Sequence, residues 1–550
     1  MSLSYSFPGI YIQELPLSTH TITPAPTSIT AFVGYTHPWK TTAFNTATQL
    51  FSFTDYETYF GGLYTSGLVN SDVAQAVYAF FLNGGNNAYV VGLQPEAFVG
   101  AVSQGYFGNN SDQFAFQAQI IPNIATPSVG IQFYALEPCD IVPMTATITN
   151  LRSPATPPSP AVYDTFDLIL TYGARIEVYR SVNITIPQGS AGSLDKLINN
   201  ISTLVTVEPI TGTSYGAPFS YVAPALPVPP APASFTLMTV ATPPAVLPAG
   251  FTGSFNPQDF ISAFQVNSSL DNVAIFNLLL VPAVTDNTVL SAALSFAERK
   301  RAFAILDPPA QASAFQNPST PALLPISTLI ADIPTSQNGA LYFPYLKTTD
   351  PISGLPTSVA PSGYVAGVFA TTDSTRGVWK APAGIATPLL GTTGPVANGV
   401  MNDQQQGVLN LDSINCLRTL SNSTVVYGAR TLVAANQAFA QSKYVPVRRM
   451  TLFIEQTLVS NLTWVVFEPN AEPLWIAITM TIEVFLLSLF NQGALQGTTP
   501  SDAFQVKCDK TTTTPADQQN GVVNIVVGVA LLKPAEFVVI TISQLAGQTS

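Results

Sequence analysis

A segment in the middle of the chain alternates between strand, helix and strand, and this order constrains the fold more than any other feature. Asn277–Pro282 and Ala302–Asp307 are short apolar runs, and Thr288–Arg301 between them places Leu290 and Leu294 on one helical face. A strand, a crossover helix and a second strand predict a parallel pair joined by a right-handed connection. We therefore expect an α/β layer here.

The N-terminal part repeats this order. Ser28–Gly34 is a short apolar strand that ends in glycine, and Ala88–Gly92 has the pattern of a buried strand. Between them we expect a helix over Ser71–Leu82, with Ser71 as its N-cap. The two stretches predict one α/β layer that is interrupted by the residues between them.

The interrupting region, from about residue 101 to residue 272, has a different composition. It is rich in Pro, Ser, Thr and Asn, and Pro224–Pro232 has the composition of a polyproline spacer. Short alternating strands such as Thr165–Leu170 and Arg175–Tyr179 recur within it. We predict an inserted, mostly β region.

Charge is scarce throughout the chain. Charged residues make up 9% of the 550 residues, against about 25% in an ordinary soluble domain. Such a surface either lies in a membrane or is covered by other copies of the chain. Leu474–Phe490 is the longest apolar run, but it is 17 residues long and contains Glu483, whereas a spanning helix needs about 20. We therefore predict a buried helix there and no membrane insertion.

The sequence offers little chemistry for catalysis. We expect His20 and His37 to be solvated or hydrogen-bonded turn residues, and no phosphate-binding or zinc-binding motif is present. The three cysteines are far apart, and the aspartates near residue 510 lack the spacing of a calcium loop. A net charge of −12 argues against nucleic-acid binding. We expect no catalytic residue, no metal and no cofactor, and hence no enzyme.

Pro361–Gly384 carries the most specific motif, PSGYVAGVFATTDSTRGVWKAPAG. It resembles the signature of contractile tail sheath proteins, a family that includes phage tail sheaths and the sheaths of pyocins and extracellular contractile injection systems. Asp373, Arg376 and Lys380 are its charged members. We expect them to be structural and to lie at the joint between the core and the C-terminal domain.

A second set of motifs in the C-terminal part is similar to the same family. Arg448 and Arg449 follow a Tyr-Val-Pro-Val run, and Glu468 precedes Trp475 in a proline-bounded turn. The resemblance covers residues 1 to about 100 and 273 to 550. It implies an α/β and α+β multidomain protein, divided into an N-terminal linker arm (1–24), a sheath core in two parts (25–100 and 273–407), an inserted mostly-β outer region (101–272), a C-terminal sheath domain facing the inner tube (408–530) and a C-terminal strand arm (531–550).

The resemblance implies a mechanical function. Subunits of such sheaths polymerise as stacked rings around an inner tube in a metastable extended state, and contraction drives the tube through a target envelope. The implied partners are further copies of the chain, paralogous sheath subunits, the inner tube protein, and baseplate and tail-terminator or cap proteins. The implied location is a phage tail or tail-like particle that is assembled in the bacterial cytoplasm, with or without release from the cell.

The two ends of the chain are candidate strand donors. Ile10, Tyr11 and Ile12 at one end and Phe537, Val539 and Ile540 at the other have the composition of short β-strands. Each end either completes its own sheet or adds a strand to a neighbouring subunit, and the family resemblance favours the second option. Glu472 and Glu483 are candidate tube-facing residues.

Two other classes remain as alternatives. A β-rich, adhesin-like surface protein would fit the Thr- and Pro-rich middle, but would need an export signal. A carbohydrate-active enzyme would need paired acidic residues in a cleft, and none stand out in the sequence. Phage, pyocin and extracellular injection system are not separated by the sequence.

Overall fold

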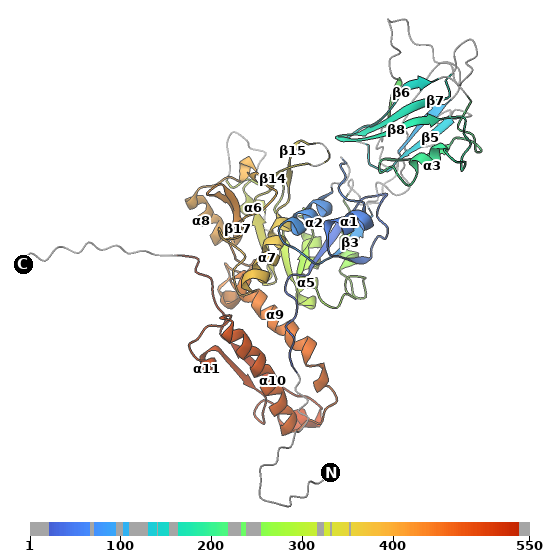
Figure 1. Ribbon diagram of the computed structural model, residues 1–550. Coiled ribbons are helices and arrows are strands. Elements are labelled where there is room, and N and C mark those ends of the chain that lie inside the picture. The colour runs from blue at the N-terminus through green and yellow to red at the C-terminus, as the bar shows by residue number, and fades with distance from the viewer. Residues whose placement is uncertain are drawn as a thin grey trace, which may run out of the picture. The chain divides into compact units, whose positions relative to one another are not determined.

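The computed structural model describes most of the chain (Figure 1). The described residues are 21–66, 71–94, 103–108, 130–139, 141–152, 163–217, 233–237, 255–315, 324–329, 333–350, 352 and 354–537. The chain divides into two compact units, one from Pro26 to Arg448 and the other formed by Met1–Ala25 together with Arg449–Ser550. We call them the α/β unit and the C-terminal unit.

An eight-stranded sheet forms the centre of the α/β unit. Its order is β18-β17-β13-β12-β11-β1-β3-β2, and all neighbours are parallel except for the two edge pairs. The strands are β1 (Thr30–Tyr35), β2 (Ala47–Leu50), β3 (Ala88–Leu93), β11 (Leu278–Leu280), β12 (Phe303–Leu306), β13 (Gly339–Phe343), β17 (Ile414–Leu420) and β18 (Ser423–Val426). The inner strands are buried on both faces, as a parallel sheet covered by helices requires.

The parallel pair predicted from residues 277–307 is confirmed. β11 pairs with β12 through Leu278–Phe303 and Leu280–Ile305. The intervening helix α5 begins after Asp286, whose carboxylate accepts the backbone N–H groups of Thr288 and Val289. The helices of this unit are α1 (Phe53–Phe60), α2 (Asp72–Leu82), α4 (Pro257–Ala263), α5 (Asn287–Lys300), α6 (Ile326–Leu329), α7 (Ser362–Arg376) and α8 (Asp403–Leu411).

Two of the predicted boundaries are wrong. β17 and β18 lie beyond residue 407, yet β17 pairs in parallel with β13, so the α/β unit continues to Arg448. The inserted region also ends earlier than residue 272. Phe260 and Phe264 from α4 and the residues after it are buried in the hydrophobic core of the α/β sheet, where Phe260 contacts the Tyr35 ring.

The inserted region forms two antiparallel sheets that enclose a hydrophobic core of their own. One sheet has the order β4-β5-β9 and the other β10-β6-β7-β8, and we call them together the inserted domain. Its elements are β4 (Ser103–Gly108), β5 (Gly130–Ala135), β6 (Met144–Arg152), β7 (Thr165–Tyr172), β8 (Arg175–Asn183), α3 (Leu194–Ile198), β9 (Val205–Pro209) and β10 (Ala233–Leu237).

A small sheet, β15-β14-β16, completes the α/β unit, with strands β14 (Leu346–Thr349), β15 (Pro356–Val359) and β16 (Gly394–Pro395). Helix α9 (Val445–Asn461) runs from the α/β unit into the C-terminal unit, since the division falls between Arg448 and Arg449. The C-terminal unit then contains α10 (Glu472–Asn491), α11 (Pro500–Ala503), β19 (Phe504–Lys507), α12 (Pro515–Gln519) and β20 (Val526–Val529).

Candidate functional site

The long helix α10 organises the C-terminal unit. It begins at Glu472, with Pro473 in its first turn, where a missing N–H costs nothing. Its buried face packs on α9, where the rings of Phe453 and Phe485 lie 6.2 Å apart, and Figure 1 shows the two helices side by side. Trp475 is buried and donates its indole N–H to Asn470 Oδ1 (2.9 Å). Trp475, predicted as a family-signature residue, therefore anchors the start of this helix.

The opposite face of α10 is apolar and exposed. Ile476, Met480 and Val484 are 55%, 61% and 65% exposed, and Leu487 continues the line. Because their spacing is four, four and three residues, they lie along one side of the helix. We call these four residues the α10 stripe. The expectation of a fully buried helix over Leu474–Phe490 is wrong: one face is buried and the other is open.

The helix is also longer than its apolar run. At 20 residues, α10 is long and apolar enough to cross a membrane by length and composition alone. Seven of its side chains are nevertheless buried against the rest of the C-terminal unit. The core helix of a soluble protein passes the same test, so the finding is weak evidence for a membrane span.

The predicted tube-facing carboxylates are both exposed on α10. Glu483 lies beside Val484 of the stripe. Glu472 lies 3.5 Å from Lys510 Nζ, and both side chains are largely in water. Such an exposed ion pair contributes little to stability. The Glu472 carboxylate is therefore available to a partner, and so is the exposed Glu483 carboxylate.

A second exposed feature is the small sheet formed by β19 and β20. The two strands pair from Phe504–Val529 to Lys507–Val526, and no further described strand joins them. An isolated two-stranded sheet is marginally stable in water. An isolated bridge joins Leu495 to Leu531 just beyond β20, and no described strand pairs with the remaining outer edges, which is the geometry that strand addition needs.

The chain ends lie mostly outside the described residues. Of the predicted strand donors, only Phe537 is described, and its side chain is 73% exposed. Ile10, Tyr11, Ile12, Val539 and Ile540 lie outside them, as does His20. The root of the N-terminal arm is described: Asn461 of α9 bonds both the N–H and the C=O of Thr23, at 2.9 and 2.8 Å. Thr23 is thus held at the end of α9, within the C-terminal unit.

The signature segment lies in the α/β unit and not at the joint that we predicted. Residues 362–376 form α7, which packs on α2. A Cβ on Gly363 would lie 2.3 Å from the Ala76 carbonyl oxygen, and one on Gly367 would lie 2.4 Å from Asn83 Cβ. The two glycines therefore allow the helices to approach closely, and the division between the units falls some 70 residues later, at Arg448.

Asp307 explains why α7 begins where it does. The cap position is Pro361, which has no side-chain hydrogen bond to offer. Instead, Asp307 accepts the backbone N–H of Ser362 (2.8 Å) and its hydroxyl (2.6 Å), and also the N–H of Ala283 (3.0 Å). Burial raises the pKa of Asp307 to about 6, although these hydrogen bonds act in the opposite direction. The Asp-Pro-Pro and Pro-Ser-Gly motifs thus contact each other.

The charged signature residues have separate structural surroundings. Arg376 is exposed at the end of α7, and Asp373 is half-buried one turn earlier. Lys380 is also half-buried and donates to the carbonyls of Ala381 and Ala383. Burial and the nearby charge of Arg376 lower the pKa of Lys380. None of the three forms part of a cluster that could bind a metal in the described part of the chain.

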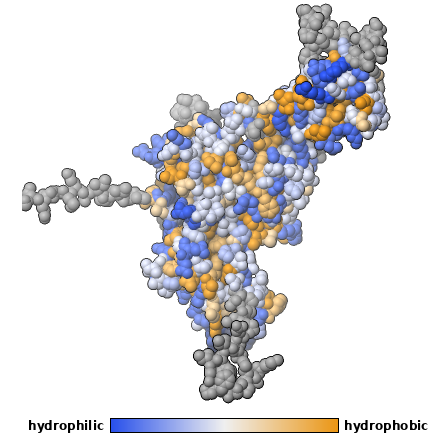
Figure 2. Space-filling model, viewed as in Figure 1, coloured by the Kyte–Doolittle hydropathy of each residue, from blue (hydrophilic) through white to orange (hydrophobic). Residues whose placement is uncertain are grey.

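The remaining signature residues divide between the two units. Arg448 donates its Nε–H to Asn338 Oδ1 (2.9 Å) in the α/β unit. Arg449 is buried in the C-terminal unit, and Glu468 is exposed before α10. On the face that Figure 2 shows, hydrophobic side chains are spread widely among hydrophilic ones.

The described part of the α/β unit holds no metal-binding cluster, and the C-terminal unit presents a two-stranded sheet and an exposed apolar helix face. The sequence matches the profile of the phage tail sheath protein central domain over residues 265–432 and that of the phage tail sheath C-terminal domain over residues 435–544. The chain belongs to the contractile tail sheath family.

Solved structures share the fold over nearly the whole chain. The anti-feeding prophage (AFP) baseplate structure matches with a TM-score of 0.54 at 20% identity, covering 99% of this chain and 100% of that one. The sheath complex of PVC, an extracellular contractile injection system, in its contracted state gives 0.55 at 19% identity, with 99% of each chain covered. The contracted AFP helical sheath gives 0.54 at 20%, covering 98% and 100%. No curated protein matches.

Proposed function

We propose that this chain is the subunit of a contractile sheath that polymerises around an inner tube in a metastable extended state and shortens to drive the tube through a target envelope. The observation that carries the proposal is the α10 stripe, an apolar surface on a family member whose described part offers no metal-binding cluster. Exposed apolar patches on soluble proteins mark interaction sites. The role is mechanical and needs no cofactor.

The C-terminal unit supplies both kinds of contact in this proposal. The β19–β20 sheet receives strands from the terminal arms of neighbouring subunits, and α10, with Glu472 and Glu483, faces the tube. The inserted domain faces outward. The partners are other copies of the chain, paralogous sheath subunits, the tube, and baseplate and cap proteins. Assembly takes place in the bacterial cytoplasm, and the particle is then retained or released.

Among sheath-bearing particles, an extracellular injection system is the favoured class, because both AFP and PVC structures match over almost their full length.

Electron microscopy of the purified protein tests the proposal. Helical tubes of two lengths and widths are expected when the chain is produced with the tube protein encoded beside it. A monodisperse, non-polymerising protein under all conditions would contradict it.

Charging the α10 stripe is expected to separate the sheath from its tube. In the double variant Met480→Glu/Val484→Glu, carboxylates replace apolar contacts, so extended particles should be lost while contracted sheath still forms. Particle counts by negative-stain microscopy measure this. Val408→Glu on α8 is the matched control, since Val408 is 51% exposed on a helix of the other unit. Equal loss of extended particles in both variants would mean that α10 does not contact the tube.

A further inference from the structure

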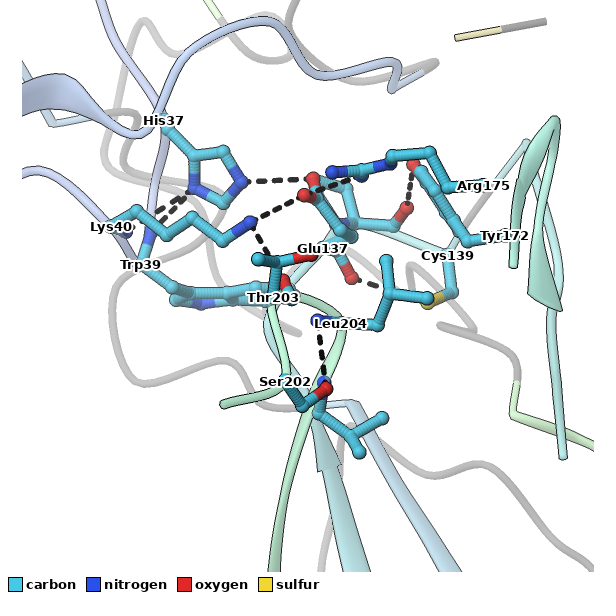
Figure 3. A network of polar contacts seen from close by, with 12 residues as sticks. His37, Trp39, Lys40, Glu137, Cys139, Tyr172, Arg175, Ser202, Thr203 and Leu204 are labelled. Atoms are coloured by element: carbon cyan, nitrogen blue, oxygen red, sulfur yellow. Dashed lines mark hydrogen bonds and ion pairs between the residues drawn. The ribbon is translucent and has the colours of Figure 1, made fainter. Parts of the chain in front are cut away.

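One carboxylate links the inserted domain to the rest of the α/β unit. Glu137 follows β5 of the inserted domain and is fully buried. It lies 3.0 Å from Nε2 of His37, which follows β1, and forms ion pairs with Lys40 from the same turn and with Arg175 from the start of β8. Figure 3 shows the carboxylate between these groups. Two segments about 100 residues apart in sequence thus meet at one buried charge.

The geometry fixes the protonation of His37. Its Nδ1 accepts the backbone N–H groups of Trp39 (3.2 Å) and Lys40 (3.3 Å), so that nitrogen carries no proton. The remaining proton is on Nε2 and is donated to Glu137. His37 is therefore a neutral donor at neutral pH. Our expectation of a hydrogen-bonded turn residue is correct in part, but it missed the burial and the contact with Glu137.

Both sides of this contact are held rigidly. On the inserted domain, Tyr172 donates its hydroxyl to the Pro138 carbonyl (2.7 Å), and Leu136 donates its N–H to the Leu204 carbonyl (2.8 Å). On the core side, a Cβ on Gly61 would lie 2.3 Å from Lys40 Cβ, so the end of α1 is packed against the His37–Lys40 turn. The segments that carry the carboxylate and its core partners are therefore each held by contacts of their own.

Two further contacts join the same two parts. Lys40 Nζ also donates to the Thr203 carbonyl of the inserted domain (3.0 Å). Ile352, from the β14–β15 connection, accepts the N–H of Ala174 (3.1 Å) and buries its side chain in the hydrophobic core of the inserted domain. An inserted domain that was joined to the core only by flexible linkers would need none of these contacts. They place the inserted domain in one position on the core.

We propose that Glu137, His37, Lys40 and Arg175 form a buried ionic lock that fixes the inserted domain to the α/β core, so that the two move as one body. That the body is a moving sheath subunit rests on the proposed function, but the lock itself does not. A buried carboxylate that loses its partners is strongly destabilised. The junction therefore opens when Glu137 or Lys40 loses its charge, while the sheets on either side stay folded.

Hydrogen–deuterium exchange on the full-length chain tests the lock. In Glu137→Gln we expect exchange at least tenfold faster in peptides covering residues 36–42 and 172–176, with β6 and β7 unchanged. Lys40→Met should do the same from the core side, where it cannot unfold the inserted domain. Asp167→Asn is the matched control, because it removes a carboxylate paired with Arg152 inside the inserted domain and away from the junction.

The outcomes are distinct. Faster exchange confined to the two junction peptides in Glu137→Gln and Lys40→Met, but not in Asp167→Asn, supports the lock. Unchanged exchange of the junction peptides in Lys40→Met overturns the lock. A rise in exchange throughout β6 and β7 in Glu137→Gln, with no change in Lys40→Met, overturns it as well. The readout does not depend on polymerisation, so a failure of the proposed sheath function leaves the test intact.

Acid should weaken the same junction. Burial lowers the pKa of His37 below its ordinary 6.5. Burial alone would raise the pKa of Glu137, but the hydrogen bond from His37 and the charges of Lys40 and Arg175 lower it to about 2. Both groups take up protons more readily when the junction is open, so its stability falls as pH drops below 6.5 and falls further between 4.5 and about 2.

Protection factors for residues 172–176 measure this effect, because they correct for the intrinsic pH dependence of exchange. They should fall between pH 7.5 and pH 5 in the wild type. In His37→Gln, which keeps an amide donor but does not titrate, most of that fall should disappear. The rings of Tyr64 and Tyr172 are the aromatic neighbours of His37 and Arg175. An equal fall in both proteins would contradict a role for His37.

Discussion

Gly363→Val is expected to lower the free energy of unfolding of the α/β unit by about 3 kcal/mol or more. The added side chain would meet backbone atoms of Ala76, whose Cα lies 2.5 Å from the position of a Cβ on Gly363. Backbone cannot move aside as the end of a flexible side chain can, so α7 and α2 must separate. Urea unfolding followed by circular dichroism gives the change in midpoint.

A glycine on another helix supplies the control. A Cβ on Gly407 of α8 would have no atom within 4 Å. Gly407→Ala should therefore gain up to about 1 kcal/mol from helix propensity. If Gly363→Val unfolds at the wild-type midpoint, close packing of α7 on α2 does not support the fold, and the spacing of Gly363 and Gly367 needs another reason.

The signature segment shows what the sequence could and could not predict. Its residues identify the family, but we expect its charged residues at the joint before the C-terminal domain, whereas the structure has one continuous helix, α7, within the α/β unit. The four-residue spacing of Gly363 and Gly367 indicates a close helix contact, because it places both glycines on one helical face. The sequence does not predict which helix the two glycines contact, since α2 is nearly 290 residues earlier in the chain.

The misplaced boundary at residue 408 has a similar cause. Strands β1, β3, β11 and β12 were predicted because apolar runs mark them locally. β17 also has a local strand pattern, but its membership of the large sheet depends on pairing with β13, about 70 residues earlier. Local patterns identify a strand and leave its partner open. The lock at Glu137 was missed for the same reason, because His37 and Glu137 meet only in the folded chain.

Charge scarcity predicts a covered surface, and the α10 stripe is a candidate for part of it. Ile476, Met480 and Val484 form an open apolar line on α10, although the run was expected to be buried. A helix that is apolar all round is normally buried on all sides. Here one half packs within the chain, so the other half is available to a partner outside it.

The second large effect is expected from changes in the terminal arms, which we propose to join neighbouring subunits. A strand of six residues gains about six backbone hydrogen bonds at a net ~0.5–1.5 kcal/mol each, while ordering it costs ~1–2 kcal/mol for each residue. These two terms nearly cancel. The net affinity of a strand for the β19–β20 sheet must therefore come from buried apolar side chains, at roughly 1.5–3 kcal/mol each.

Ile10→Asp/Ile12→Asp is accordingly expected to abolish sheath polymerisation while the subunit stays folded. Losing two such side chains removes at least ~3 kcal/mol from each joint, a factor of more than a hundred in its equilibrium constant. Phe537→Asp at the other end, where the side chain is 73% exposed in the isolated chain, should act in the same direction with a smaller effect. Sedimentation and negative-stain microscopy measure assembly, and circular dichroism checks the fold.

Ser4→Asp/Ser6→Asp adds the same charge to the same arm, at the same spacing, without removing an apolar side chain. If burial of Ile10 and Ile12 drives the joint, this control polymerises and the isoleucine variant does not. Tubes of normal length from the isoleucine variant would exclude strand donation by the N-terminal arm. Loss of tubes in both variants would instead assign the effect to charge. The comparison thus distinguishes apolar burial from electrostatic repulsion as the source of cohesion between subunits.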